Sequence, residues 1–151
     1  MEAFLVSTAV VALGEIGDKT QLLALLLAAR FRRPWPIVAG ILVATLVNHA
    51  LAGAVGNWVR SVVPPEALKW LLAISFFAVA AWALRPDELD DDKPPVSKAG
   101  VFVVTAVAFF LAEMGDKTQV ATVMLAAKFP SLPAVVIGTT LGMLLANVPV
   151  V

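Results

Sequence analysis

The chain has 151 residues, of which 60% are hydrophobic and 15% are charged, with 11 acidic and 11 basic side chains. A soluble domain carries about 25% charged residues, so this composition, with a mean hydropathy of +0.91, excludes a soluble globular protein and indicates an integral membrane protein. Zero net charge gives no indication of a nucleic-acid partner, and the absence of cysteine excludes disulfides, thiolate metal sites and thiol catalysis.

Five continuous apolar segments predict an all-α membrane protein with about five transmembrane helices. We expect these spans at about 3–31, 37–59, 67–84, 100–129 and from 134 onward. The first is longer than a hydrocarbon core of about 30 Å requires, and Gly17 is the natural place for a break in it. No basic region or small-residue cleavage site precedes it, so we expect a retained span rather than a signal peptide.

A polar, proline-containing stretch separates the third and fourth spans. We interpret 86–98 as a solvated, acidic, cytoplasmic linker between a first unit (1–85) and a second unit (99–151). The alternative is that its acidic residues attract cations to the protein. The distribution of basic residues predicts that the N-terminus is outside. This orientation places six in the cytoplasm (Arg30, Arg32, Arg33, Arg85, Lys93 and Lys98) and three outside (Arg60, Lys69 and Lys128).

The two units are an internal repeat. At a shift of 98 residues, positions 13–31 and 111–129 match at 11 of 19 residues, including two heptapeptides that begin at Glu15 and Glu113. Three spans precede the second unit, so it enters the membrane from the opposite side, as in the inverted repeats of secondary transporters. The second unit has room for only two spans, and we expect the chain to be a fragment that lacks its last helix.

Each heptapeptide places two carboxylates and a lysine within an apolar span. A charged residue at the centre of a membrane helix costs roughly 2.5–3.5 kcal/mol, so we expect partners to satisfy these groups. On a continuous helix, Glu15 and Asp18 point the same way, and Lys19 can reach Glu15. If the two units face each other, four carboxylates converge: Glu15, Asp18, Glu113 and Asp116.

Four carboxylates and two lysines sum to a charge of −2, which matches one divalent cation. Carboxylate, hydroxyl and amide oxygens suit hard ions such as Ca²⁺ and Mn²⁺, and protons compete for clustered carboxylates. The residues therefore predict exchange of a metal ion for protons, with no permanently bound cofactor. The predicted supporting residues are Lys19, Thr20, Gln21, Lys117, Thr118, Gln119, Asn48 and Asn147.

The sequence leaves open the roles of several polar and charged residues in the predicted spans. Glu15–Lys19 and Glu113–Lys117 could be intrahelical ion pairs that only lock helices together, and the lysines could either compensate charge or take part in transport. The glutamines could line the site or only bond between helices. His49, the single histidine, could relay protons or serve packing and hydrogen bonding, because Asn147 occupies its place in the second unit. We expect Asn48 and Asn147 to make helix–helix hydrogen bonds before serving as ligands.

The heptapeptides resemble the duplicated E-x-G-D-[KR]-[TS] signature of the GDT-type manganese/calcium transporters of the Golgi and bacteria. Both copies are complete, at 15–20 and 113–118, and the likeness extends over nearly the whole chain. The resemblance implies cation/proton antiport, with export of Mn²⁺ from the cytoplasm in bacteria and loading of Mn²⁺ or Ca²⁺ into the Golgi in eukaryotes. Of these, we expect Mn²⁺ export across a bacterial plasma membrane. It also implies that Glu15, Asp18, Glu113 and Asp116 are the metal-binding acids. Members of that family have six core spans, whereas this chain has room for five.

Two other functions for these acidic groups are alternatives to antiport. Export of a small organic cation or amino acid would need a roomier, partly apolar cavity, and a non-transporting scaffold would use the acids only as helix locks. An intramembrane aspartyl protease is disfavoured, because Glu15 interrupts the required G-x-G-D spacing. The chain also has no tyrosine to form the Tyr-Asp motif of such enzymes. We therefore expect a transporter rather than an enzyme, with a metal ion, protons and the lipid bilayer as partners and a possible homo-oligomer.

Overall fold

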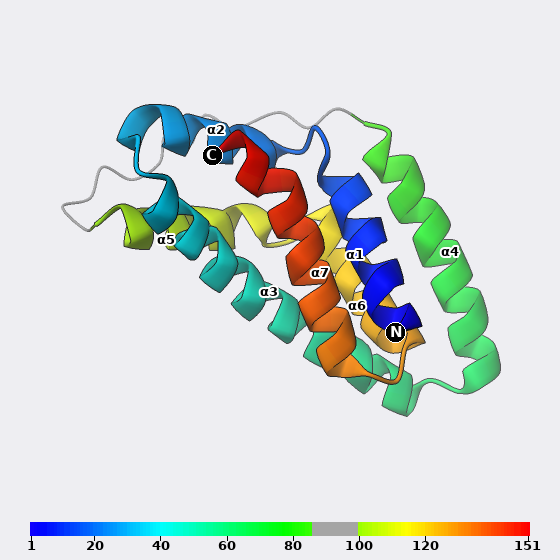
Figure 1. Cartoon of the computed structure of the whole chain (residues 1–151). Coiled ribbons are helices and arrows are strands. Elements are labelled where there is room, and N and C mark those ends of the chain that lie inside the picture. Colours follow the sequence, from blue (N-terminus) through cyan, green and yellow to red (C-terminus); the bar gives the residue numbers. More distant parts are fainter. Residues whose placement is uncertain (86–99) are drawn as a thin grey trace.

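The computed structural model describes residues 1–85 and 100–151, and all regular structure in these ranges is helical (Figure 1). The elements are α1 (Glu2–Glu15), α2 (Lys19–Phe31), α3 (Pro34–Val62), α4 (Pro65–Ala83), α5 (Val101–Glu113), α6 (Lys117–Lys128), α7 (Leu132–Asn147) and the 3-10 turn η1 (Val148–Val150). The prediction of an all-α membrane protein is confirmed. The predicted linker at 86–98 lies outside the described residues.

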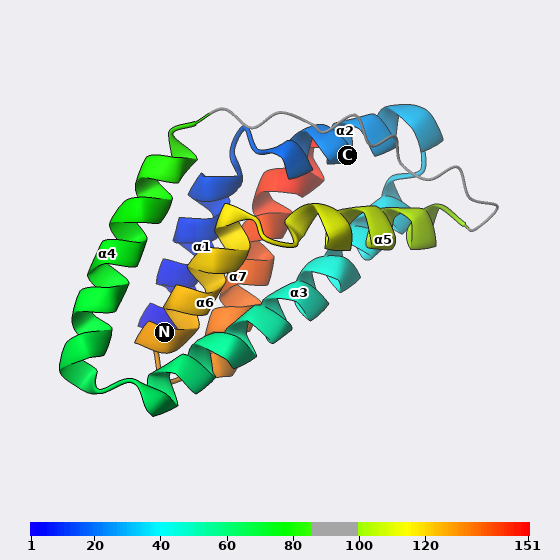
Figure 2. The same ribbon diagram turned by 180° about the vertical axis from the view of Figure 1, so that it is seen from behind.

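Three segments of the described chain are long and apolar enough to cross a membrane: Pro34–Val62, Pro65–Ala83 and Leu132–Val150. They correspond to the second, third and fifth predicted spans. The first and fourth predicted spans are not continuous helices, because α1 is followed by α2 and α5 by α6 after a short turn. Figures 1 and 2 show α2 and α5 running across the bundle rather than along the axes of α1 and α6.

Each break is made at a glycine. Gly17 has φ of +79° and Gly115 has φ of +75°, a left-handed conformation that glycine adopts without the steric penalty of a side chain. The predicted break at Gly17 is therefore confirmed, and an equivalent break occurs 98 residues later.

The helices of one half pack mainly on those of the other half (Figure 2). Helix α1 lies along α7, and α5 packs against α3. Buried residues recur every four positions along α1, so they form one stripe on the inward face of the helix. Helix α5 has the same stripe 98 residues later. The buried residues that correspond in the two stripes are Ser7, Val11 and Glu15 on α1, and Thr105, Phe109 and Glu113 on α5. Both stripes end at a glutamate, beside a break.

Helix α4 lies on the outside of the bundle, where it packs against α6 (Figures 1 and 2). None of its residues is buried within the structure. Because α4 is apolar from Trp70 onward apart from one serine, its exposed side chains suit contact with lipid.

Small residues allow the close approach of α3 to α6. A Cβ atom added at Gly56 would lie 2.1 Å from the carbonyl oxygen of Val123 and 2.8 Å from Cβ of Ala126. The oxygen belongs to the backbone, so the helices would have to move apart to admit a methyl group. Close approach at small residues is a common source of packing between membrane helices.

We predict that Gly56→Ala destabilises the protein by about 1–3 kcal/mol, the usual effect of overpacking. Thermal unfolding in detergent, followed by circular dichroism, measures the effect. Gly14→Ala is the matched control, since its added Cβ would meet only Thr118 Cγ2 at 3.7 Å and the equivalent Ala112 already carries that methyl group. Equal stability of the two variants would contradict the close α3–α6 contact.

Candidate cation site between the two helix breaks

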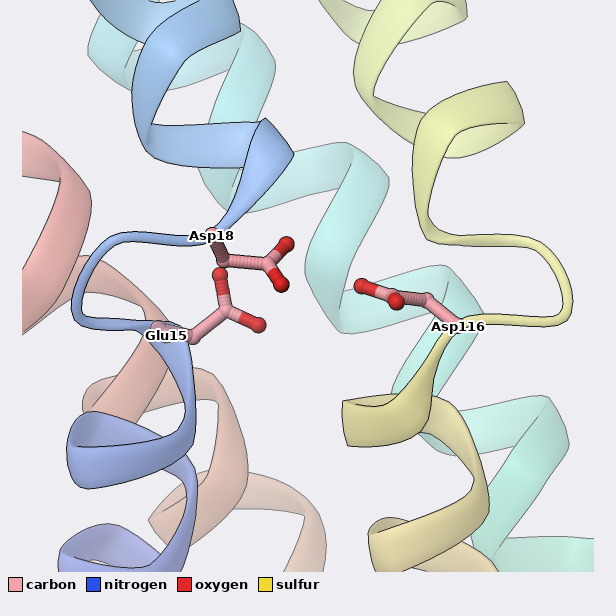
Figure 3. A group of neighbouring side chains, drawn as sticks. All are labelled: Glu15, Asp18 and Asp116. Atoms are coloured by element: carbon pink, nitrogen blue, oxygen red, sulfur yellow. The ribbon is translucent and has the colours of Figure 1, made fainter. Parts of the chain in front are cut away.

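Three acidic side chains meet where the two breaks face each other (Figure 3). Each of Glu15, Asp18 and Asp116 offers a carboxylate oxygen, and these oxygens lie within 4.8 Å of one another. Their residues are 0%, 0% and 2% exposed, respectively. Oxygens this close, at this depth, repel one another unless positive charge lies among them.

The two aspartates are placed by the helices that they begin. Asp18 is the N-cap of α2, where its Oδ2 accepts a hydrogen bond of 3.3 Å from the backbone N–H of Thr20. Asp116 is the N-cap of α6, where its Oδ1 accepts a 2.8 Å bond from the N–H of Lys117. The free N–H groups and dipole of a helix N-terminus favour negative charge. Both breaks therefore stabilise an aspartate where the helix restarts.

Glu15 is the last residue of α1, and polar groups of two other helices surround its carboxylate. The hydroxyl of Thr20 donates a short hydrogen bond to Glu15 Oε2 and lies 3.3 Å from Asp18 Oδ2. Asn147 Nδ2 on α7 is 3.5 Å from the same glutamate oxygen. Thr20 and Asn147, two predicted supporting residues, are therefore brought to this carboxylate.

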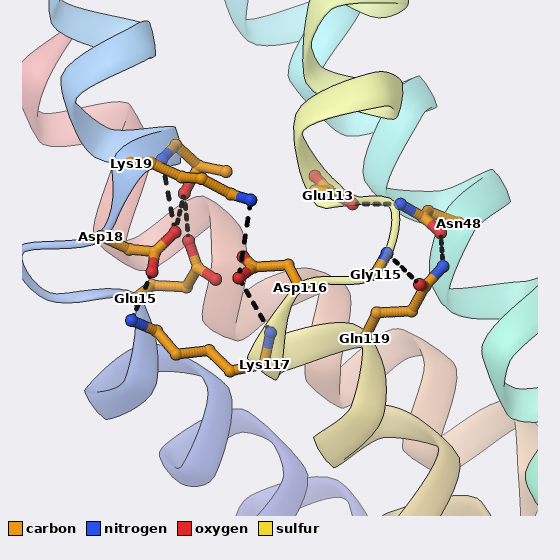
Figure 4. A network of polar contacts seen from close by, with 10 residues as sticks. Glu15, Asp18, Lys19, Asn48, Glu113, Gly115, Asp116, Lys117 and Gln119 are labelled. Atoms are coloured by element: carbon orange, nitrogen blue, oxygen red, sulfur yellow. Dashed lines mark hydrogen bonds and ion pairs between the residues drawn. The ribbon is translucent and has the colours of Figure 1, made fainter. Parts of the chain in front are cut away.

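Glu113 lies outside the group of three. Thr45 Oγ1 donates to its Oε1 at 2.7 Å, and Asn48 Nδ2 donates to its Oε2 at 3.2 Å, so this carboxylate is turned toward α3 (Figure 4). The structure thus brings together three of the four predicted acids and holds the fourth beside them. Thr45 was not predicted; its position three residues before Asn48, on one face of an apolar helix, was the available signal.

The predicted geometry within each heptapeptide is wrong. Glu15 and Asp18 are not i and i+3 on one helix, because α1 ends at Glu15 and α2 begins at Lys19. The ion pairs of the lysines run between the repeats instead (Figure 4). Lys117 Nζ is 2.6 Å from Asp18 Oδ1, and Lys19 Nζ is 3.9 Å from Asp116 Oδ1. The intrahelical pairing of Lys19 with Glu15 is replaced by a crossed arrangement.

Gln21 and Gln119 stabilise the two helix breaks by hydrogen bonds. Gln21 Oε1 accepts a 3.0 Å hydrogen bond from the N–H of Gly17, and Gln119 Oε1 accepts one of 2.7 Å from the N–H of Gly115. Their amide nitrogens reach α7 and α3: Gln21 Nε2 donates to the carbonyl oxygen of Ala146 at 2.9 Å, and Gln119 Nε2 donates to Asn48 Oδ1. The hydrogen bonds to other helices that the sequence suggested for these residues are thus present.

His49 is fully buried on α3, and within 1–85 and 100–151 neither ring nitrogen has a hydrogen-bond partner. Packing therefore describes its present contacts better than hydrogen bonding does. Three oxygen atoms at the site share this condition: Glu15 Oε1, Asp116 Oδ2 and Asn147 Oδ1 are buried with no hydrogen-bond partner among the described residues. Buried polar atoms are normally satisfied, and a set of oxygens left over in this way suits a hard cation.

The all-helical fold and the acidic site at two opposed breaks are typical of a membrane protein that binds a cation. A family model described as "Divalent cation/proton antiporter GDT1" matches residues 3–91 and 101–151. The chain belongs to this family, as the resemblance of its two heptapeptides predicted.

Named relatives agree with this assignment. The chain is 55% identical to a "Putative manganese exporter" of Vibrio cholerae, over 100% of this chain and 76% of that protein. It is 28% identical to "GDT1-like protein sll0615" of Synechocystis, over 84% of this chain and 71% of the relative. It is 27% identical to "GDT1-like protein 4" of Oryza sativa subsp. indica, over 93% of this chain and 59% of the relative. No solved structure matches the chain.

We predict that Gly17→Asn is tolerated, whereas Gly17→Val destabilises the protein by about 1–2 kcal/mol. Asparagine adopts the left-handed conformation more readily than other side chains, and β-branched residues are strained in it. No heavy atom of the described residues lies within 4 Å of an added Cβ at this position, so a difference between the variants reports backbone conformation rather than a clash. Thermal unfolding measures it, and equal stability would contradict a glycine-dependent break.

Proposed function

We propose that this protein transports Mn²⁺ across a membrane in exchange for protons, with Glu15, Asp18 and Asp116 as the cation ligands and Glu113 beside them. The observation that carries this proposal is the convergence of three buried carboxylates, with oxygens within 4.8 Å of one another. Membership of a divalent cation/proton antiporter family and similarity to a manganese exporter support the same function.

The donor atoms support a hard divalent ion. The site offers carboxylate oxygens from Glu15, Asp18 and Asp116 and the hydroxyl oxygen of Thr20, and Mn²⁺ and Ca²⁺ prefer such oxygen ligands. With Glu113 and the two lysines included, the formal charge is −2, which one divalent cation neutralises. Ca²⁺ has the same ligand preference, so it is the second cargo to be tested.

Exchange follows from competition for the same oxygens. A carboxylate binds either a metal ion or a proton, so protons that reach the cluster displace the cation, and a cation that arrives releases protons. The site lies where helices are interrupted, as in secondary transporters built from inverted repeats. The negative charge of the site is neutralised both when the metal ion is bound and when the carboxylates are protonated. This neutralisation lowers the free-energy cost of switching access to the site from one face of the membrane to the other.

We also propose that 1–85 and 99–151 are two inverted repeats, with the N-terminus outside and the linker at 86–98 in the cytoplasm. Support comes from the order of the helices and from glycine breaks 98 residues apart. The crossed ion pairs between the repeats fit the same pseudo-twofold relation. The basic residues counted above support this orientation.

We predict that Glu15→Gln and Asp116→Asn each lower Mn²⁺ flux by at least about tenfold, since even changes beyond the ligands cost about 10–100-fold in metal affinity. Flux is measured in proteoliposomes with an imposed pH gradient, and an ionophore that collapses the gradient should abolish the driven component. Glu66→Gln is the matched control, because Glu66 lies exposed in the first turn of α4.

Parallel assays with Ca²⁺ and with an organic cation such as an amino acid separate the possible cargoes. Mn²⁺ flux that persists at the wild-type rate in both acid variants would refute the proposed ligands. Folded protein with no flux of any divalent cation would support the scaffold alternative instead.

A further inference from the structure

The two lysines of the heptapeptides are bound to the aspartates of the opposite repeats. Lys117, the first residue of α6, reaches Asp18, and Lys19, the first residue of α2, reaches Asp116 (Figure 4). Each lysine directly follows its own repeat's aspartate but pairs with the other one. The result is a reciprocal clasp that joins the two breaks.

The clasp uses atoms that a cation would need. Asp18 and Asp116 both belong to the group of three converging carboxylates, and an ammonium group on an aspartate oxygen occupies the direction from which a metal ion would bind it. An ammonium group and a divalent cation also repel each other strongly in a medium of low dielectric constant. One carboxylate therefore cannot bind a lysine ammonium group and a divalent cation strongly at the same time.

We propose that Lys117 and Lys19 are built-in competitors of the transported cation: each pairs with an aspartate that the cation would bind, must give it up when the cation binds, and returns to promote release. This inference rests on the proposed function. It makes the lysines determinants of affinity and turnover, rather than locks that stay closed throughout transport.

The two competitors are not equal. The Lys117–Asp18 pair is 2.6 Å long with side chains 6% and 0% exposed, whereas the Lys19–Asp116 pair is 3.9 Å long and the Lys19 side chain is 29% exposed. Longer and more exposed pairs are weaker, because solvent screens them. Lys117 is therefore the stronger competitor.

The surroundings of Lys117 give its side chain room to leave. A cavity of about 320 Å³ lies between α1, α4 and α6, and Lys117 lines it together with Leu13, Phe76 and Ala80. The lining is mostly apolar, which suits contact with the aliphatic stem of the lysine when its ammonium group leaves Asp18.

Binding of Mn²⁺ to the purified full chain tests the proposal, with free Mn²⁺ measured by electron paramagnetic resonance. Lys117→Gln should bind Mn²⁺ at least about tenfold more tightly than wild type, the lower end of what one neighbouring charge does to proton binding by a carboxylate. Lys117→Arg, which keeps the charge, should bind within about threefold of wild type, and Lys19→Gln should tighten binding by a smaller factor than Lys117→Gln.

Transport separates competition from a purely structural role. For Lys117→Gln we expect KM and kcat of Mn²⁺ flux to fall together, because the site fills more easily and empties more slowly. Lys128→Gln is the matched control, since Lys128 lies at the exposed end of α6 beside Phe129. Mn²⁺ should also raise the unfolding temperature of Lys117→Gln more than that of wild type.

Unchanged or weaker Mn²⁺ binding by a folded Lys117→Gln protein would overturn the proposal. If that variant does not fold, Lys19→Gln decides: tighter binding supports competition, and equal or weaker binding rejects it. Failure of wild type to bind any divalent cation would instead reject the proposed function, so the two failures are distinguishable.

Discussion

Compensation of buried charge is the constraint on which this structure depends. Hydrocarbon offers no water to solvate a carboxylate, so each acid at the centre of the bundle must find its partners within the protein. Asp18 and Asp116 find helix N-terminal N–H groups on their own side and a lysine from the opposite repeat. Because the lysines are exchanged, neither break is electrostatically complete without the other.

The breaks serve this constraint by exposing backbone groups where a continuous helix would conceal them. A glycine with positive φ ends one helix, and the next begins within three residues on an aspartate cap. A glutamine one turn later then satisfies the N–H of that glycine and bonds to a helix of the other half. One short motif therefore interrupts the helix, caps its continuation and anchors it, and the chain contains this device twice.

The two copies are nevertheless used differently. Glu15 lies with the aspartates, whereas Glu113 is drawn to α3 by Thr45 and Asn48. The repeats diverge in these partners, since Met143 and Ala146 stand 98 residues after Thr45 and Asn48. Nearly identical motifs thus produce one off-centre group of three acids, and the helices that pack against the motifs decide which glutamate joins it.

The sequence by itself determined the helical membrane class, the duplication, the break at Gly17 and the candidate acidic residues. These features follow from composition, from the repeat of residues along the chain and from the conformational freedom of glycine, which are local properties. Only the tertiary structure decided which charges meet. The Glu15–Lys19 pair that the sequence left possible assumed 3.6 residues per turn through the motif, and the turn at Gly17 removes that register and places Lys19 beside Asp116. Thr45 gained its role only when α3 packed against α5. Partners across a helix interface depend on the packing of distant segments, and no local pattern in one chain encodes that geometry.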